Sequence, residues 1–219
     1  PLTVSMRLAT EFDAEGVTAV YAPFVADTAI SFEMVPPSTD EMAERMRATL
    51  ATHPWLVAET EGAVVGYAYG APFRTRAAYR WSAEVSVYIA QTFHRLGIGR
   101  RLYAALFELL SKQGYRRAYA GITLPNQASI FLHESMDFET VGAFHQAGYK
   151  FDAWHDVAWL PSRQHPRRLR ASTRFAETRV GTIARRLSQV AARALGQSRS
   201  RLRCRKCKVT KALACNSAC

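Results

Sequence analysis

The feature that most restricts the fold of this 219-residue chain is a strand that leads through a glycine-containing loop into a long helix. Residues 81–90 alternate in polarity and are rich in β-branched and aromatic side chains, which predicts a central strand. Apolar residues at helical spacing predict the helix over residues 100–113. The loop between them contains Gly97 and Gly99, which leave backbone N–H groups accessible at a helix N-terminus. This combination predicts a pyrophosphate site.

The loop matches neither of two common phosphate-binding motifs. A dinucleotide fingerprint requires a third glycine where this chain has Leu102, and a Walker loop requires Lys where it has Arg100. A Gly-x-Gly pair by itself is equally compatible with a plain turn. Arg95, Arg100 and Arg101 would strengthen the attraction of the loop for phosphate.

The other elements expected in residues 1–160 are short and mixed. Helical spacing predicts helices over residues 10–25, 41–51 and 128–136. Alternation and turn residues predict a hairpin of strands 55–59 and 63–69, followed by strands 115–124, 138–143 and 156–160. We therefore expect an α/β (α+β) fold with a mixed sheet and helices on both faces.

Charge and cysteine content divide the chain after Leu160. Residues 1–160 contain 13 Lys and Arg against 17 Asp and Glu, whereas residues 161–219 contain 16 Lys and Arg and one acid. The formal net charge of +11 therefore does not indicate that residues 1–160 bind a polyanion. These residues contain no cysteine and need no disulfide, and residues 1–6 are unlike a secretory signal, so we expect a cytoplasmic protein.

The basic C-terminal tail, residues 161–219, is expected to be disordered or outside the core. Its alternatives are an amphipathic helix over residues 175–195 that contacts nucleic acid or a membrane, and a zinc site. We expect no metal, because only seven residues separate the two cysteine pairs, which is short for a zinc module. The cysteines are Cys204, Cys207, Cys215 and Cys219.

Five motifs follow one another along residues 6–160: Glu84-Val-Ser-Val-Tyr-Ile, Arg95-Leu-Gly-Ile-Gly, Leu124-Pro-Asn-Gln-Ala-Ser, Leu132-His-Glu and Gly148-Tyr-Lys-Phe-Asp-Ala-Trp-His-Asp-Val. On these motifs the chain resembles the phosphinothricin N-acetyltransferases of the GNAT superfamily, whose relatives acetylate methionine sulfoximine and methionine sulfone. The resemblance implies the GNAT fold, with a central, mixed, mostly antiparallel sheet flanked by helices. It also implies acetyl-CoA as acetyl donor, a small amino-acid-like amine as acceptor, and a homodimer. His94 departs from the usual Gln or Arg of the family loop, and Asp137 from the usual Gly, but neither change removes a catalytic group.

The catalytic residues implied by the resemblance are Glu84, His133 and Tyr88. Glu84 would act as general base, through a water molecule, and the alternative is a surface glutamate in an ion pair. His133 matches a histidine implicated beside that glutamate, and the alternative is a packing or capping histidine. Tyr88 could protonate the departing thiolate, with strand packing or substrate contact as alternatives. A backbone N–H near Val87 would face the thioester carbonyl.

The resemblance also assigns donor-binding and acceptor-binding residues. Arg74 and Arg76 match a basic pair whose planar guanidinium groups suit anionic substrate groups, and the alternative is a solvated loop pair. Phe32, Tyr79 and Trp81 could form an apolar wall around the substrate, with core packing as the alternative. The acetyl-CoA site would comprise Val85, Val87, Arg95, Leu96, Gly97, Ile98, Gly99, Arg100, Asn126 and Ser129. For Asn126 the alternative is a turn residue that follows Pro125.

The function expected from the resemblance is acetylation of a small amine of the phosphinothricin, methionine sulfoximine or methionine sulfone type. An alternative in the same class is acetylation of peptide N-termini or of another amine. An alternative of a different class is a nucleic-acid-binding or membrane-binding protein that acts through residues 161–219.

Overall fold

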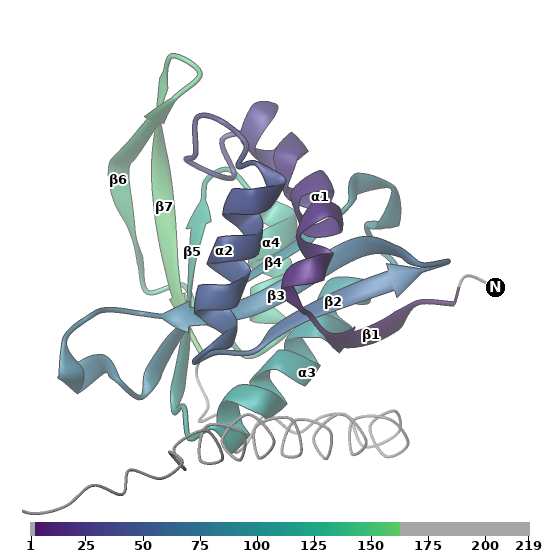
Figure 1. The fold of residues 1–219 in the computed structure, drawn as a ribbon. Coiled ribbons are helices and arrows are strands. Elements are labelled where there is room, and N and C mark those ends of the chain that lie inside the picture. The colour runs from purple at the N-terminus through teal and green to yellow at the C-terminus, as the bar shows by residue number, and fades with distance from the viewer. Residues whose placement is uncertain (1–2, 163–219) are drawn as a thin grey trace, which may run out of the picture.

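A computed structural model describes residues 3–162, which form one seven-stranded sheet covered by helices on both faces (Figure 1). The sheet has the order β1-β2-β3-β4-β5-β7-β6, and every neighbouring pair except β4–β5 is antiparallel. This confirms the expected mixed, mostly antiparallel sheet. The strands are β1 (Ser5–Leu8), β2 (Trp55–Thr60), β3 (Ala63–Pro72), β4 (Ser82–Ile89), β5 (Arg117–Thr123), β6 (Gly142–Lys150) and β7 (Ala153–Pro161).

The helices divide between the two faces of the sheet, as Figure 1 shows with α1 and α2 in front of β3 and β4. One face packs against α3, which buries Leu102, Leu106 and Leu110 along a single side. The other face packs against α1 and α2, with Met42 and Met46 one helical turn apart in the second core. The α-helices are α1 (Ala14–Ala26), α2 (Thr39–Leu50), α3 (Ile98–Lys112) and α4 (Gln127–Glu134), and the short 3-10 helices are η1 (Glu11–Asp13), η2 (Ala77–Tyr79) and η3 (Gln91–Phe93).

The parallel strands β4 and β5 are paired over only part of their length. Their register joins Ser82, Ala83 and Glu84 to residues 117–119 and then stops, although both strands continue. Beyond this point β5 pairs with β7 on its other side, and the edge of β4 that faces β5 has no strand partner. Glu84 and Tyr119 therefore mark the point where the two strands separate.

The sheet differs from expectation at its last strands. The predicted strand over residues 138–143 is wrong: β6 runs over Gly142–Lys150, and Phe138 forms only an isolated bridge to Ser162. Phe138 is buried in the α3 core, whereas most β6 residues are exposed, so this edge strand lacks the polarity pattern that marks a half-buried strand. The short strand β1 is an addition that the sequence pattern did not predict.

The sheet extends past the boundary expected at Leu160. Pro161 ends β7, and Ser162 is buried, with its N–H donating to the Ala118 carbonyl at 2.8 Å. The predictions for the rest of the tail, including the cysteine zinc site and the amphipathic helix, lie outside the described residues.

Candidate active site

Glu84 lies where β4 and β5 separate, on the face of the sheet that α1 and α2 cover. Its cross-strand neighbours are Ala71 on β3 and Tyr119 on β5. The carboxyl is half-buried, and this burial raises its pKa above the ordinary glutamate value, while the positive charge of Arg74 opposes the increase. A carboxylate with a raised pKa is suited to accept a proton near neutral pH.

A set of polar and aromatic side chains surrounds Glu84 on this face, which we call the acceptor face. Tyr69 on β3 lies directly opposite Ser86, two residues from Glu84 on β4. On the other side of Glu84, the ring of Tyr119 stacks on Phe73 with centroids 4.0 Å apart. Trp159 meets the same Phe73 ring edge to face. These residues were missed at the sequence level, although the hairpin register of β3 and β4 could have indicated Tyr69.

Trp159 carries an unsatisfied polar group. Its indole Nε1–H is buried and has no hydrogen-bond partner within residues 3–162. An unpaired buried donor costs about 1–3 kcal/mol, so a ligand oxygen that accepted this bond would be stabilised.

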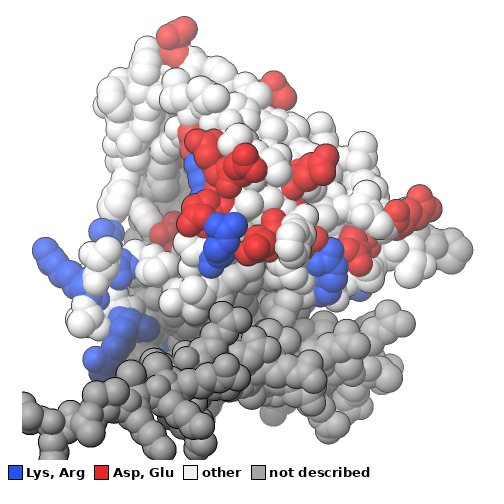
Figure 2. Space-filling model, in the orientation of Figure 1, with Lys and Arg blue, Asp and Glu red and all other residues white. Residues whose placement is uncertain are grey.

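The basic loop between β3 and β4 lies next to Glu84. The guanidinium of Arg74 lies 5.2 Å from the centre of the Phe73 ring, and Tyr79 packs edge to face on the same ring at 5.7 Å. Arg76 is exposed and forms the N-cap of η2. Figure 2 shows acidic side chains gathered over α1, α2 and the segment between them, with a few basic side chains among them and a further basic group at the lower left. Some of these acidic side chains are paired with Arg45 and Arg47, and the loop adds the positive charges of Arg74 and Arg76 beside them.

Phe32 also lies at the acceptor face. It belongs to the segment between α1 and α2, and its ring packs on the backbone of Gly148 in β6 and 6.3 Å from the His155 ring. The structure therefore places Arg74 and Tyr79 near the side chains that surround Glu84. Phe32 lies toward the other end of the same face, against Gly148 and His155.

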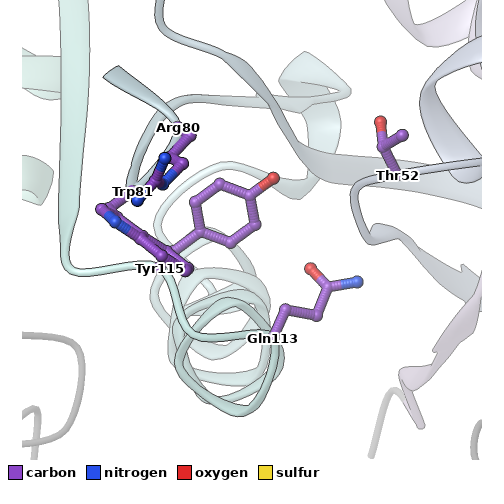
Figure 3. Close-up of a pocket in the computed structure, with 5 residues that line it drawn as sticks. All are labelled: Thr52, Arg80, Trp81, Gln113 and Tyr115. Atoms are coloured by element: carbon purple, nitrogen blue, oxygen red, sulfur yellow. The ribbon is translucent and has the colours of Figure 1, made fainter. Parts of the chain in front are cut away.

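Trp81 lies elsewhere, against Gly114 on the α3 side of the sheet. Because side chains alternate along a strand, positions 81 and 84 point to opposite faces. Trp81 instead lines a cavity of about 350 Å³, drawn in Figure 3, together with Thr52, Arg80, Gln113 and Tyr115. The structure does not bring Trp81 together with the expected substrate residues.

The glycine loop has the geometry expected of an anion site. Gly97 has φ +74°, a left-handed conformation that strains any L side chain, and it forms the N-cap of α3. No acidic residue lies in the first turn of α3, while Arg95, Leu96 and Arg100 are exposed. The His94 Nε2–H donates to the Ile89 carbonyl at 2.8 Å and joins the loop to the end of β4. The residues present therefore fit a pyrophosphate.

The remaining donor-site residues contribute through backbone or caps. Val85 and Val87 direct their side chains toward the α3 core, so only their backbone can face β5. Ile98 is buried and Gly99 is partly buried beneath the loop. The Asn126 side chain accepts a hydrogen bond from the Ser129 N–H at 3.1 Å and thereby caps the N-terminus of α4. This is a structural role at the turn before α4.

His133 and Tyr88 are not adjacent to Glu84. His133 is buried between α3 and α4, where its Nδ1–H donates to the Ser129 carbonyl and its Nε2 accepts from the Tyr103 hydroxyl. Burial lowers the pKa of His133 and favours the neutral ring. Tyr88 lies four residues along β4 from Glu84, about 13 Å at the rise of a strand, and packs against Tyr21. Burial raises the pKa of Tyr88 well above its ordinary value.

Residues 3–162 contain neither a membrane-crossing helix nor a cluster of metal ligands. No helix between residues 3 and 162 is long and apolar enough to cross a bilayer. Within the same range, no three His, Cys, Asp or Glu side chains gather as metal ligands would.

Comparisons with known proteins agree with this geometry. Residues 6–159 match the acetyltransferase (GNAT) domain family. A phosphinothricin N-acetyltransferase of Streptomyces viridochromogenes is 36% identical over 156 residues, or 71% of this chain and 85% of that protein. An L-methionine sulfoximine/L-methionine sulfone acetyltransferase of Salmonella typhimurium is 32% identical over 158 residues, 72% of this chain and 92% of that protein.

Solved structures give the same result at the level of the fold. A phosphinothricin acetyltransferase of Sinorhizobium meliloti in complex with acetyl-CoA has a TM-score of 0.70 and 34% identity, covering 73% of this chain and 88% of that one. A ribosomal-protein-alanine N-acetyltransferase of Brucella melitensis has a TM-score of 0.69 and 37% identity, covering 72% and 98%. The family match, the relatives and the shared fold together show that this chain belongs to the GNAT acetyltransferase family.

Proposed function

We propose that the protein transfers an acetyl group from acetyl-CoA to the primary amine of a small amino-acid-like substrate, with Glu84 as general base. The observation that carries this proposal is the position of Glu84, a half-buried carboxyl at the point where β4 and β5 separate. From that point β4 continues, without pairing to β5, toward the glycine loop before α3, whose residues fit a pyrophosphate. Both halves of an acetyl transfer can therefore meet at one place.

The mechanism follows from the groups present. Acetyl-CoA supplies an activated acetyl group: a C–N bond forms to the acceptor amine, the C–S bond to CoA breaks, and the CoA thiolate leaves and takes up a proton that the attacking nitrogen gives up. Glu84 accepts the proton that the ammonium of the acceptor must lose before its nitrogen can attack, through water. A backbone N–H of β4 near Val87 donates to the carbonyl oxygen as negative charge develops there. Residues 95–100 and the N-terminus of α3 hold the pyrophosphate. We assign Tyr88 and His133 supporting roles only, because neither lies beside Glu84.

Recognition of the acceptor rests on charge and on one unpaired donor. Arg74 and Arg76 are placed to attract the carboxylate and the second polar group of a phosphinate or sulfoximine amino acid. The buried Trp159 Nε1–H would gain a partner from an oxygen of either group. Phe32 and Tyr79 would contact the apolar stem. The names of the Streptomyces, Sinorhizobium and Salmonella proteins support this substrate class.

A second candidate is acetylation of peptide N-termini, which is favoured by the similarity to the ribosomal-protein-alanine N-acetyltransferase of Brucella melitensis. The two candidates share the donor site and Glu84. They differ in the acceptor, since an alanine N-terminus lacks the second polar group that Arg74 and Arg76 would bind.

We also propose the limits of the catalytic domain, the location of the enzyme and its oligomeric state. Residues 1–160 would form the catalytic domain, and residues 161–219 would not be needed for catalysis. We also propose that the enzyme acts in the cytoplasm as a homodimer. Exposed aromatic side chains along the β6–β7 hairpin support a self-association surface, and they include Phe144, Tyr149 and Trp154.

The test is release of the CoA thiol with a panel of acceptors: phosphinothricin, methionine sulfoximine, methionine sulfone, ordinary amino acids and alanine-terminated peptides. We expect turnover with at least one of the first three, and turnover with peptides alone would contradict the proposal. A chain ending at Ser162, which retains the buried end of the sheet, should keep this activity. Loss of activity in that shorter chain would instead favour a function located in residues 163–219.

A further inference from the structure

Lys150, the last residue of β6, is buried and holds three backbone carbonyls. Its side chain is among the largest that are fully buried, with 2% exposure. The ammonium Nζ donates to the carbonyls of Val25 at 2.6 Å, Ser31 at 2.7 Å and Glu33 at 2.7 Å. A lysine ammonium has three N–H donors, so every one of them has a partner here.

The three carbonyls belong to the end of α1 and to the segment that follows it, residues 27–38, which we call the α1–α2 segment. Lys150 lies more than 100 positions further along the chain, and its ammonium connects this segment to the β6–β7 hairpin. The segment is also bound on its helical side, where Arg45 pairs with Glu33 at 2.7 Å and Tyr21 bonds to Ser31 at 2.7 Å. On the sheet side, Lys150 holds the segment through three hydrogen bonds.

Phe32 lies between the two segment residues whose carbonyls Lys150 holds. Its ring covers the backbone of Gly148 so closely that a Cβ at position 148 would lie 2.4 Å from the ring. The Thr123 hydroxyl on β5 also donates to the carbonyl of Ile30. Thr123 is four residues from Tyr119 and so points to the acceptor face. The α1–α2 segment thus borders this face at the end opposite Glu84.

Packing alone does not account for a lysine at this position. A methionine or leucine could fill the volume without the cost of burying a charge, which is several kcal/mol for an ion in a protein interior. Burial also lowers the pKa of Lys150, and the carboxylate of Glu33 opposes this change. Within residues 3–162, the hydrogen-bond partners of the ammonium are three backbone carbonyls, through which it holds the end of α1 and the α1–α2 segment.

We propose that Lys150 is a positioning residue for the acceptor: its ammonium fixes the α1–α2 segment so that Phe32 forms one wall of the acceptor site. This inference rests on the proposed function, because it assumes that the amine binds on the acceptor face. Lys150 touches neither reacting group, so its loss should weaken acceptor binding without removing the base.

The test compares steady-state kinetics of the full chain with those of Lys150→Met. We expect KM for the acceptor amine to rise about tenfold or more, with KM for acetyl-CoA changed less than about twofold. Lys112→Met, which removes an exposed lysine paired with Glu108 on α3, is the matched control and should change neither KM. An unchanged acceptor KM in a folded Lys150→Met protein would overturn the proposal, as would a parallel rise of both KM values.

A second variant covers the case in which Lys150→Met fails to fold. Gly148→Ala displaces the Phe32 ring and leaves the ammonium in place. It should also raise the acceptor KM and not that of acetyl-CoA, and an unchanged acceptor KM in this variant would contradict the role given to Phe32.

Hydrogen exchange separates this proposal from the proposed function. Lys150→Met should accelerate amide exchange in residues 27–38, with little change in α3. If the wild-type chain acetylates no amine, the proposed function fails, and exchange in residues 27–38 still reports whether Lys150 fixes the segment. Exchange that is unchanged, or faster throughout the protein, would overturn the positioning role.

Discussion

The two sides of strand β4 differ in what they bury. On the α3 side, Ala83 and Val85 are almost fully buried in a continuous apolar core. On the acceptor face lie the alternate residues Glu84, Ser86 and Tyr88. Their side chains are polar, and each residue keeps part of its surface exposed to solvent. The first side holds the strand in place through close packing, and the second side keeps groups that can exchange protons. One eight-residue strand thus separates the source of stability from the proposed source of catalysis.

This separation explains why burial has different consequences on the two sides. Burial of an apolar side chain stabilises the fold, whereas burial of a carboxyl raises its pKa and makes it a better proton acceptor near neutral pH. For Glu84 the raised pKa is caused by burial, and Arg74 opposes it. Substitutions on the acceptor face should therefore change the rate, and those on the α3 side should change the stability.

The largest effect is expected from Glu84→Gln, which keeps the shape of the side chain and removes the base. We expect kcat to fall about a thousandfold, or about 4 kcal/mol, with little change in KM for acetyl-CoA. The wild-type rate should rise with pH as the carboxyl loses its proton, and this limb of a pH–rate profile should be absent in the variant. Glu134→Gln, at an exposed position of α4, is the control. A wild-type pH profile in Glu84→Gln would contradict the base assignment.

A substitution on the α3 side of the sheet should lower the free energy of unfolding by a comparable amount and leave catalysis unchanged. Leu106→Ala removes a fully buried α3 side chain and should lower the free energy of unfolding by about 3 kcal/mol, measured with urea. The rate per folded molecule, and its dependence on pH, should remain close to those of the wild type. If the pH–rate profile moved in this variant, the two sides of β4 would not be independent.

The smallest effect is a shift of the pH profile of kcat, measured with saturating acceptor, in Arg74→Gln. Arg74 lowers the pKa of Glu84, so its removal should move the limb in which activity rises with pH toward higher pH. At a mildly acidic pH the variant should therefore be slower than the wild type, and at a higher pH the difference should shrink. Arg76→Gln is the matched control, since Arg76 is not among the groups that shift the pKa of Glu84. Equal shifts in both variants would indicate a general effect of loop charge.

Sequence patterns predicted the centre of the fold better than its edges. The strand over residues 81–90 and the following helix have strong periodicity, and the structure has β4 and α3 there. The edge strand β6 lacked such a pattern, because most of its residues are exposed, and the strand predicted over residues 138–143 was wrong. For the candidate site, Trp81 is the informative case. Its odd separation from Glu84 within one strand already placed the two side chains on opposite faces.

The sequence alone therefore determined the order of most elements, the family and the glycine loop, since these depend on local periodicity and on motifs read within a few residues. Tertiary structure decided which distant residues meet. Only the folded chain joins Phe73 to Tyr119, leaves Trp159 Nε1 without a partner in residues 3–162, and places Lys150 among carbonyls of the α1–α2 segment. The physical reason is that such contacts, and the burial that shifts the pKa of Glu84, depend on strand register and on packing between remote segments.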